Sequence, residues 1–339
     1  MTRAFWAPGR VNLIGEYTDL VGGLVLPAAL DLGITLAGEA AEEIVLRSPD
    51  YGNVQLPADG SGDQAKGWGR YVAAVAAELA ALGRAPVGFD GELSSTLPAG
   101  AGLSSSAALE IAVATALCAV ADFAVQPLEL AKAARRAEHR AVGVPSGIMD
   151  QAASLLGRSG HALLLDTGTL EYEHVPLPPD LALVIVDSGV ARALEGTGYA
   201  TRKRELEEGH PKRRRHIETE NHRVQAAVRA FREDDRAALG EIFRAGHESL
   251  RVDLEVTIPA LDRLVELAYA HGAVAARMTG GGFGGAIVAL VDGNRAESLA
   301  EAVVSGYGEG ARSYICRASG GARELGQTEE LGQTEGLRS

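Results

Sequence analysis

Residues 97–108 read LPAGAGLSSSAA and join a predicted strand over 88–94 to a predicted helix over 105–120. Small side chains in such a loop let phosphate oxygens approach backbone N–H groups, and the helix N-terminus adds partial positive charge. Serine hydroxyls can also reach a phosphate or Mg²⁺, although serines cap helices routinely. Three consecutive serines after Gly-Ala-Gly exceed what a cap needs, so the segment predicts a phosphate-binding loop.

Other phosphate-binding patterns are missing from the sequence. It contains no Gly-x4-Gly-Lys-[Ser/Thr] motif and no protein-kinase motif set. The chain has four lysines, none of them in a glycine loop, namely Lys66, Lys132, Lys203 and Lys212. We therefore expect a metal ion, backbone N–H groups and arginine side chains to compensate the negative charge of a bound phosphate.

The composition indicates a globular protein and disfavours some classes of binding partner. Of 339 residues, 46% are hydrophobic and 23% are charged, which is typical of folded soluble chains. The 32 basic and 45 acidic residues give a net charge of −13, which disfavours nucleic acid as a partner. No apolar run reaches the ~18 residues that span a membrane, so no membrane partner is expected. Only Cys118 and Cys316 are present, which favours a reducing, cytoplasmic location.

The chain divides at PLPPD, residues 176–180, because adjacent prolines exclude regular structure. We expect a first domain over 1–178 and a second over 179–320. The remainder, 321–339, contains the polar repeat LGQTEELGQTEG and is expected to be a disordered tail. Residues 202–215 carry seven basic positions interleaved with three glutamates, which favours a solvated helix face over an anion-binding patch.

The stretch APGRVNLIGEYTD, residues 7–19, places Arg10, Glu16 and Asp19 around two glycines. Taken alone, such residues are typical of a polar turn. They are equally the groups needed to hydrogen-bond several sugar hydroxyls at once, so both interpretations stay open from these residues.

Two further glycine-bearing segments lie downstream. In SGIMDQ, residues 146–151, Asp150 follows a glycine turn and is either a general base or a helix cap. In MTGGGFGG, residues 278–285, the glycine spacing matches a dinucleotide fingerprint, but a predicted helix precedes it and a strand follows. We therefore expect a glycine turn packed closely against another loop.

Together these segments resemble the galactokinase branch of the GHMP small-molecule kinases. The resemblance rests on GRVNLIGEYTD, LPAGAGLSSSAALE, SGIMDQ and RMTGGGFGG, and HESLRVDLEVTIPALD is similar to the C-terminal domain of that branch. It implies an α+β fold of two domains with the active site in the cleft between them. It also implies transfer of the γ-phosphate of ATP to the anomeric hydroxyl of galactose, with Mg²⁺. We expect a monomer.

The resemblance implies roles for individual residues. Asp150 matches the catalytic base and Arg10 its partner. The implied sugar contacts are Glu16, Tyr17, Asp19, Gly147 and Tyr199. The implied ATP-binding residues are Trp68, Gly100, Ala101, Gly102, Leu103, Ser104, Ser105 and Ser106. Ser106 and Glu138 match the magnesium positions.

Two positions depart from the pattern of that branch. Tyr17 stands where histidine is typical, and Ser146 stands where cysteine is typical. Because tyrosine is longer and cannot become cationic, a sugar hydroxyl contact must change or be lost. The alternatives are a kinase of the same fold acting on L-arabinose, galacturonate or N-acetylgalactosamine, and a sugar-sensing protein on the same scaffold, against which intact Arg10 and Asp150 argue.

Overall fold

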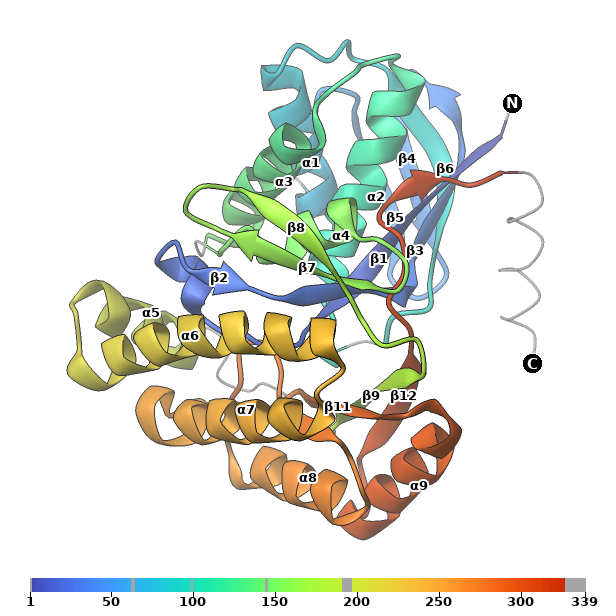
Figure 1. The fold of residues 1–339 in the computed structure, drawn as a ribbon. Helices are drawn as coiled ribbons and strands as arrows, with labels where there is room; N and C mark the ends of the chain where they lie inside the picture. The colour runs from blue at the N-terminus through green and yellow to red at the C-terminus, as the bar shows by residue number, and fades with distance from the viewer. Residues whose placement is uncertain (1, 62–64, 99, 144–145, 191–196, 327–339) are drawn as a thin grey trace.

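The structure is a computed structural model that describes residues 2–61, 65–98, 100–143, 146–190 and 197–326. One group of helices and strands, built from the N-terminal half, lies above a second group built from the C-terminal half (Figure 1). Both groups mix helices with largely antiparallel sheets. This is the α+β class that the sequence predicts.

A six-stranded sheet forms the base of the first group, in the order β13-β1-β3-β6-β4-β5. Its strands are β1 (Arg3–Asn12), β3 (Pro27–Ala41), β4 (Glu43–Ser48), β5 (Gly52–Pro57), β6 (Gly88–Ser95) and β13 (Arg323–Glu324). Apolar residues alternate into the core, and Phe5 of β1 lies opposite Leu36 of β3. The register of this pair shifts between Pro8 and Arg10, where β1 approaches the phosphate loop.

Four helices pack near this sheet: α1 (Gly69–Ala81), α2 (Ser105–Val120), α3 (Pro127–Val142) and α4 (Met149–Leu156). The bounds of α2 are those that the sequence predicts, 105–120. Helix α2 contacts β1, β3, α1 and α3, so it is buried on almost every side and its apolar residues cover more than one face. Pro127 begins α3 and Gly143, with φ +73°, ends it.

The second group is built on a four-stranded sheet in the order β10-β11-β9-β12. Its strands are β9 (Leu181–Asp187), β10 (Ala275–Met278), β11 (Ala286–Asp292) and β12 (Arg312–Cys316). Its helices are α5 (Thr197–Glu207), α6 (Pro211–Glu233), α7 (Arg236–Ser249), the π-helix η2 (Leu250–Leu254), α8 (Pro259–Ala270) and α9 (Ala296–Tyr307). A small sheet of β2 (Leu24–Val25), β7 (His161–Asp166) and β8 (Tyr172–Pro176) contacts α6 and so connects the two groups.

The C-terminal part of the chain returns to the first sheet. Ala318 bridges Leu30, and β13 pairs with β1, where the Arg323 guanidinium lies over the Trp6 ring. The expectation of disorder is therefore wrong for residues 323–324, because strand pairing and burial of Leu325 hold them. The rest of the predicted tail, 327–339, lies outside the described residues.

Residues 202–215 do not form one solvated helix. Gly209, with φ +75°, separates α5 from α6. The Arg213 side chain is only 3% exposed, and its guanidinium pairs with Glu205 at 2.7 Å and Glu255 at 2.8 Å. The prediction fails at Arg213 because acidic partners, one of them distant in sequence, allow this cation to be buried. Among the described helices, none has the length and apolar character needed to cross a membrane.

Candidate active site

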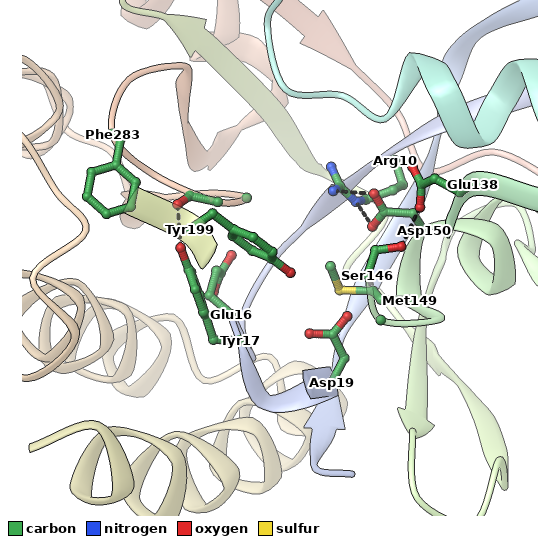
Figure 2. A pocket seen from close by; sticks show the side chains of 13 residues that line it. Arg10, Glu16, Tyr17, Asp19, Glu138, Ser146, Met149, Asp150, Tyr199 and Phe283 are labelled. Atoms are coloured by element: carbon green, nitrogen blue, oxygen red, sulfur yellow. Dashed lines mark hydrogen bonds and ion pairs between the residues drawn. The ribbon is translucent and has the colours of Figure 1, made fainter. Parts of the chain in front are cut away.

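A cavity of about 250 Å³ lies between the two groups of elements (Figure 2). Its lining includes eight residues to which the sequence analysis assigns catalytic, sugar or metal roles: Arg10, Glu16, Tyr17, Asp19, Glu138, Gly147, Asp150 and Tyr199. Ser146, Met149, Gly280, Gly281 and Phe283 complete it. Residues spread over most of the chain therefore converge on one polar cavity, which we call the first cavity.

Arg10 and Asp150 form an ion pair on the wall of this cavity. Arg10 Nε and Nη2 donate to the two carboxylate oxygens of Asp150 at 2.7 and 2.8 Å, which is a bidentate pair. The Asp150 side chain stays 26% exposed, whereas the Arg10 side chain is 8% exposed. From the sequence, Asp150 could have been the cap of helix α4. Its carboxylate instead pairs with the Arg10 guanidinium at the cavity wall, so Asp150 is not that cap.

The phosphate loop is tied to the same pair. Arg10 Nη1 donates to the carbonyl of Gly102 at 2.8 Å, and the Arg10 backbone N–H donates to the carbonyl of Leu103 at 3.1 Å. The Ser104 hydroxyl donates to Asp150, and Ser104 adopts a left-handed backbone with φ +58° at the start of α2. The loop therefore ends beside the carboxylate that faces the first cavity.

A second cavity, of about 230 Å³, is lined in part by the phosphate loop. Its wall includes four residues to which the sequence analysis assigns ATP binding, Trp68, Gly100, Ser105 and Ser106. Tyr51, Tyr71 and the apolar residues Ile34, Leu93, Leu97 and Leu109 complete it, together with Ser95. Ala101 and Leu103 belong to the same loop and are buried. The Trp68 indole donates to the Tyr51 carbonyl at 3.0 Å, which fixes the ring at the mouth of this apolar space.

Ser106 and Glu138 connect the two cavities. Ser106 lines the second cavity, Glu138 lines the first, and the Ser106 hydroxyl donates to Glu138 Oε1 at 3.0 Å. The Ser146 hydroxyl and the Gln151 amide donate to Glu138 Oε2 at 2.5 and 3.1 Å. A hydroxyl and a carboxylate beside a phosphate loop fit Mg²⁺, which prefers few protein oxygens and completes its shell with phosphate and water.

Glu16 belongs to a buried triad that joins the two groups of elements. Arg277 Nη2 donates to Glu16 Oε2 at 2.5 Å and to Glu220 Oε1 at 2.7 Å, and all three side chains are at most 1% exposed. Glu220 also accepts from the Gly15 backbone N–H at 3.0 Å and from Arg223 Nε at 2.7 Å. Because Glu220 contacts both arginines, their charges outweigh the effect of burial and lower its pKa to about 2, whereas burial raises the pKa of Glu16 to about 7.

Asp19 and Gly147 meet at the opposite wall. A Cβ atom on Gly147 would lie 1.6 Å from Asp19 Oδ2, so only glycine leaves room for this carboxylate. Burial, with the charge of nearby Asp150, raises the pKa of Asp19 to about 7, against the opposing effects of Arg10 and Arg135.

The glycine run forms a turn, as the sequence predicts, but it joins the two strands β10 and β11, and the expectation that a helix directly precedes it is wrong. The Phe283 backbone N–H donates to the Val256 carbonyl at 2.7 Å, and a Cβ on Gly282 would lie 2.3 Å from that oxygen. Thr279 exchanges hydrogen bonds with the Asn12 backbone at 2.8 and 3.2 Å. The close packing against another loop is thus confirmed, and the turn also binds the end of β1.

Several residues that line the two cavities or pair with their lining carried no predicted role. Gly281 and Phe283 belong to the glycine motif, and a charged Arg277 directly before that motif is a signal that could have been used. Tyr51 and Glu220 stand in segments without a recognisable motif, so nothing local in the sequence marks them.

The chain matches models of three known protein regions: "GHMP kinases N terminal domain" over residues 70–158, "GHMP kinases C terminal" over 227–309 and "Galactokinase galactose-binding signature" over 2–40. The galactokinase of Chloroflexus aurantiacus is 37% identical and the match covers 94% of this chain and 93% of that protein. The galactokinase of Thermococcus kodakarensis is also 37% identical, with 89% and 93% covered.

Solved structures agree with these relatives. The structure of Lactococcus lactis galactokinase complexed with galactose has a TM-score of 0.91 and 32% identity, covering 96% of this chain and 95% of that one. The mevalonate kinase of Methanococcus jannaschii, with a TM-score of 0.73 and 21% identity, shares the fold over 93% of this chain and 98% of its own. With its two GHMP domains, its signature segment and its full-length similarity to these enzymes, the chain belongs to the galactokinase branch of the GHMP kinase family.

Proposed function

We propose that this ATP-dependent sugar kinase transfers the γ-phosphate of ATP to the anomeric hydroxyl of D-galactose, with the sugar in the first cavity and the nucleotide in the second. One observation carries the proposal: the Arg10–Asp150 pair faces the first cavity and is bonded to the phosphate loop through Ser104 and Gly102. A sugar hydroxyl beside Asp150 would thus lie close to a phosphate held by that loop.

In the proposed reaction, Asp150 takes the proton of the anomeric hydroxyl while the sugar oxygen attacks the γ-phosphorus and ADP leaves. Arg10 orients the carboxylate and its guanidinium stabilises negative charge that spreads over the transferring group. Glu16 and Asp19, with the backbone at Gly147 and the Tyr199 hydroxyl, would bind the other sugar hydroxyls. Trp68, Tyr51 and the apolar wall of the second cavity would hold the adenine.

We also propose that Glu138 and Ser106 hold Mg²⁺. When bound, the ion neutralises charge on the nucleotide phosphates. The three hydrogen bonds that Glu138 accepts keep its carboxylate between the two cavities, where such an ion would be needed.

The proposal includes a domain division, a monomer and a cytoplasmic enzyme. We keep the boundary at residues 178 and 179, before β9, and assign the returning segment 317–326 to the first domain because it pairs with β1 and β3. One chain supplies both walls of the first cavity, so a monomer suffices. Cys118 and Cys316 are buried and free, as suits a reducing compartment.

A second candidate is a kinase for a related sugar, and the hydroxyl of Tyr17 favours it. This hydroxyl donates to the carbonyl of Gly281 at 2.7 Å instead of pointing to the middle of the cavity. L-arabinose lacks one hydroxyl of galactose. In a site without a partner for that hydroxyl, L-arabinose would lose less binding free energy than in a site built to bind it.

The test is ADP release with Mg-ATP against galactose, 2-deoxygalactose, glucose, N-acetylgalactosamine, L-arabinose and galacturonate. We expect galactose to lead in kcat/KM by about tenfold or more, as a site that pairs each sugar hydroxyl should give. A lead by another sugar would replace galactose as the substrate, and sugar binding without turnover would contradict kinase activity.

A further inference from the structure

Tyr17 lies in the first-cavity wall with its hydroxyl turned toward the C-terminal group. Its backbone is left-handed, with φ +67°, which is rare for a bulky side chain and persists only where the surroundings hold it. The side chain is 4% exposed, and its hydroxyl donates to the Gly281 carbonyl at 2.7 Å. Tyr17 thus spans from the signature segment to the glycine turn.

Tyr199, in the first turn of α5, packs on Tyr17 and beside the same glycine. The two tyrosine rings are 5.2 Å apart between centroids with planes tilted by 42°. On another side, a Cβ on Gly281 would lie 3.6 Å from Tyr199 Cδ2. Figure 2 shows the Tyr199 hydroxyl reaching toward the middle of the cavity, between Asp19 and Arg10. The Tyr17 hydroxyl points instead to the backbone carbonyl of Gly281.

We propose that Tyr17 is a positioning residue for sugar binding, which holds the Tyr199 ring against the glycine turn so that the Tyr199 hydroxyl faces the sugar. The inference rests on the proposed function only in that the first cavity must bind a sugar. The Tyr17 ring supplies the packing surface, and its bond to Gly281 fixes the distance between the signature segment and the turn. Because the hydroxyl is committed to Gly281, Tyr17 acts on the sugar through Tyr199.

The first test compares Tyr17→Phe and Tyr17→Leu with the wild-type full-length chain, by calorimetric titration with galactose and by the KM for ATP. We expect Tyr17→Phe to weaken galactose binding about threefold to tenfold, the effect of one hydrogen bond, and Tyr17→Leu to weaken it further. The KM for ATP should stay within about twofold, since the second cavity shares no wall with Tyr17. Equal losses for galactose and ATP would overturn the proposal.

Tyr269→Phe is the matched control. The Tyr269 hydroxyl also donates to a glycine carbonyl, that of Gly240 at 3.2 Å, but Tyr269 does not line the first cavity. We expect this variant to lower Tm about as much as Tyr17→Phe while galactose affinity is unchanged. A matching loss of affinity in Tyr269→Phe would show that general destabilisation, not positioning, explains the effect.

A double-mutant cycle separates positioning from direct contact. If Tyr17 acts through Tyr199, Tyr17→Leu should cost little once Tyr199→Leu is present, with the double variant within about twofold of Tyr199→Leu alone. Independent, multiplying losses would overturn the proposal. If wild type binds L-arabinose but not galactose, the substrate proposal fails and the same cycle is read with L-arabinose. If it binds no sugar of the panel, both proposals fail.

Discussion

Two arginine–carboxylate clusters flank the first cavity, and they differ in exposure. In the Arg10–Asp150 pair the carboxylate side chain is 26% exposed, so a substrate can reach it. In the triad of Arg277, Glu16 and Glu220, each side chain is at most 1% exposed. The same kind of ion pair is therefore proposed to serve chemistry where it is open to the cavity, whereas it joins distant elements where it is closed.

Asp150→Asn should have the largest effect. Loss of a general base lowers kcat by about 10² to 10⁴-fold, while galactose binding should stay within about tenfold because the base acts mainly in the transition state. Steady-state ADP release and calorimetry measure the two quantities. A near-normal kcat would remove Asp150 from the role of base and leave the exposed pair without its proposed chemistry.

Arg277→Met should lower stability, and it should also disturb the sugar contact proposed for Glu16, which pairs with Arg277. It leaves two buried carboxylates without their shared cation, which costs about 3 to 5 kcal/mol of unfolding free energy. Arg251→Met is the control, because Arg251 and its partner Glu248 are about half exposed and such pairs contribute at most about 1 kcal/mol. Urea unfolding of both variants measures the difference, and equal losses would contradict the contrast between closed and open pairs.

Ser104→Ala should reduce kcat about tenfold, because one hydrogen bond to the Asp150 carboxylate is lost. Ser104→Gly loses the same hydroxyl but suits the left-handed backbone, with φ +58°. We therefore expect similar kcat values for the two variants and a higher Tm for Ser104→Gly. If Ser104→Gly kept the wild-type kcat, backbone strain would explain the lower kcat of Ser104→Ala, and the hydroxyl would have no role in catalysis.

The smallest expected effect is a pH dependence at Asp19. Its pKa of about 7 in the folded chain exceeds the ordinary value of 3.8, so folding favours the protonated form and this residue's contribution to stability falls as pH rises from about 4 to 7. Asp19→Asn should remove that fall and raise unfolding free energy at pH 8 by about 1 kcal/mol, after allowance for solvent screening at this half-buried site. Thermal unfolding of the wild type and of Asp19→Asn at pH 5 and pH 8 tests this prediction. An equal difference in stability between the two proteins at both pH values would contradict it.

Local sequence signals predicted much of the fold. The bounds of α2 were predicted from the small-residue loop that precedes it, and the resemblance to a known family implied that Arg10 is the partner of Asp150. Long-range contacts were not predictable in this way. The burial of Arg213 depends in part on Glu255, 42 residues away, and β13 depends on pairing with β1 at the other end of the chain.

The candidate site also combines features that local motifs predict with contacts that they do not predict. The first cavity gathers eight of the nine residues to which the resemblance assigns catalytic, sugar and metal roles, and the ninth, Ser106, lines the second cavity. The partner of Glu16 is Arg277, 261 residues away, and the partner of the Tyr17 hydroxyl is a backbone carbonyl. Neither partner could be read from composition or spacing, since a backbone acceptor exists at every residue.

The most direct test is ³¹P and ¹H NMR of the product formed from galactose and Mg-ATP. The account predicts ADP and a phosphate ester on the anomeric carbon, seen as phosphorus coupling to the anomeric proton. A phosphate on another hydroxyl, or inorganic phosphate from ATP hydrolysis alone, would contradict the claim that the Arg10–Asp150 pair directs transfer to the anomeric oxygen.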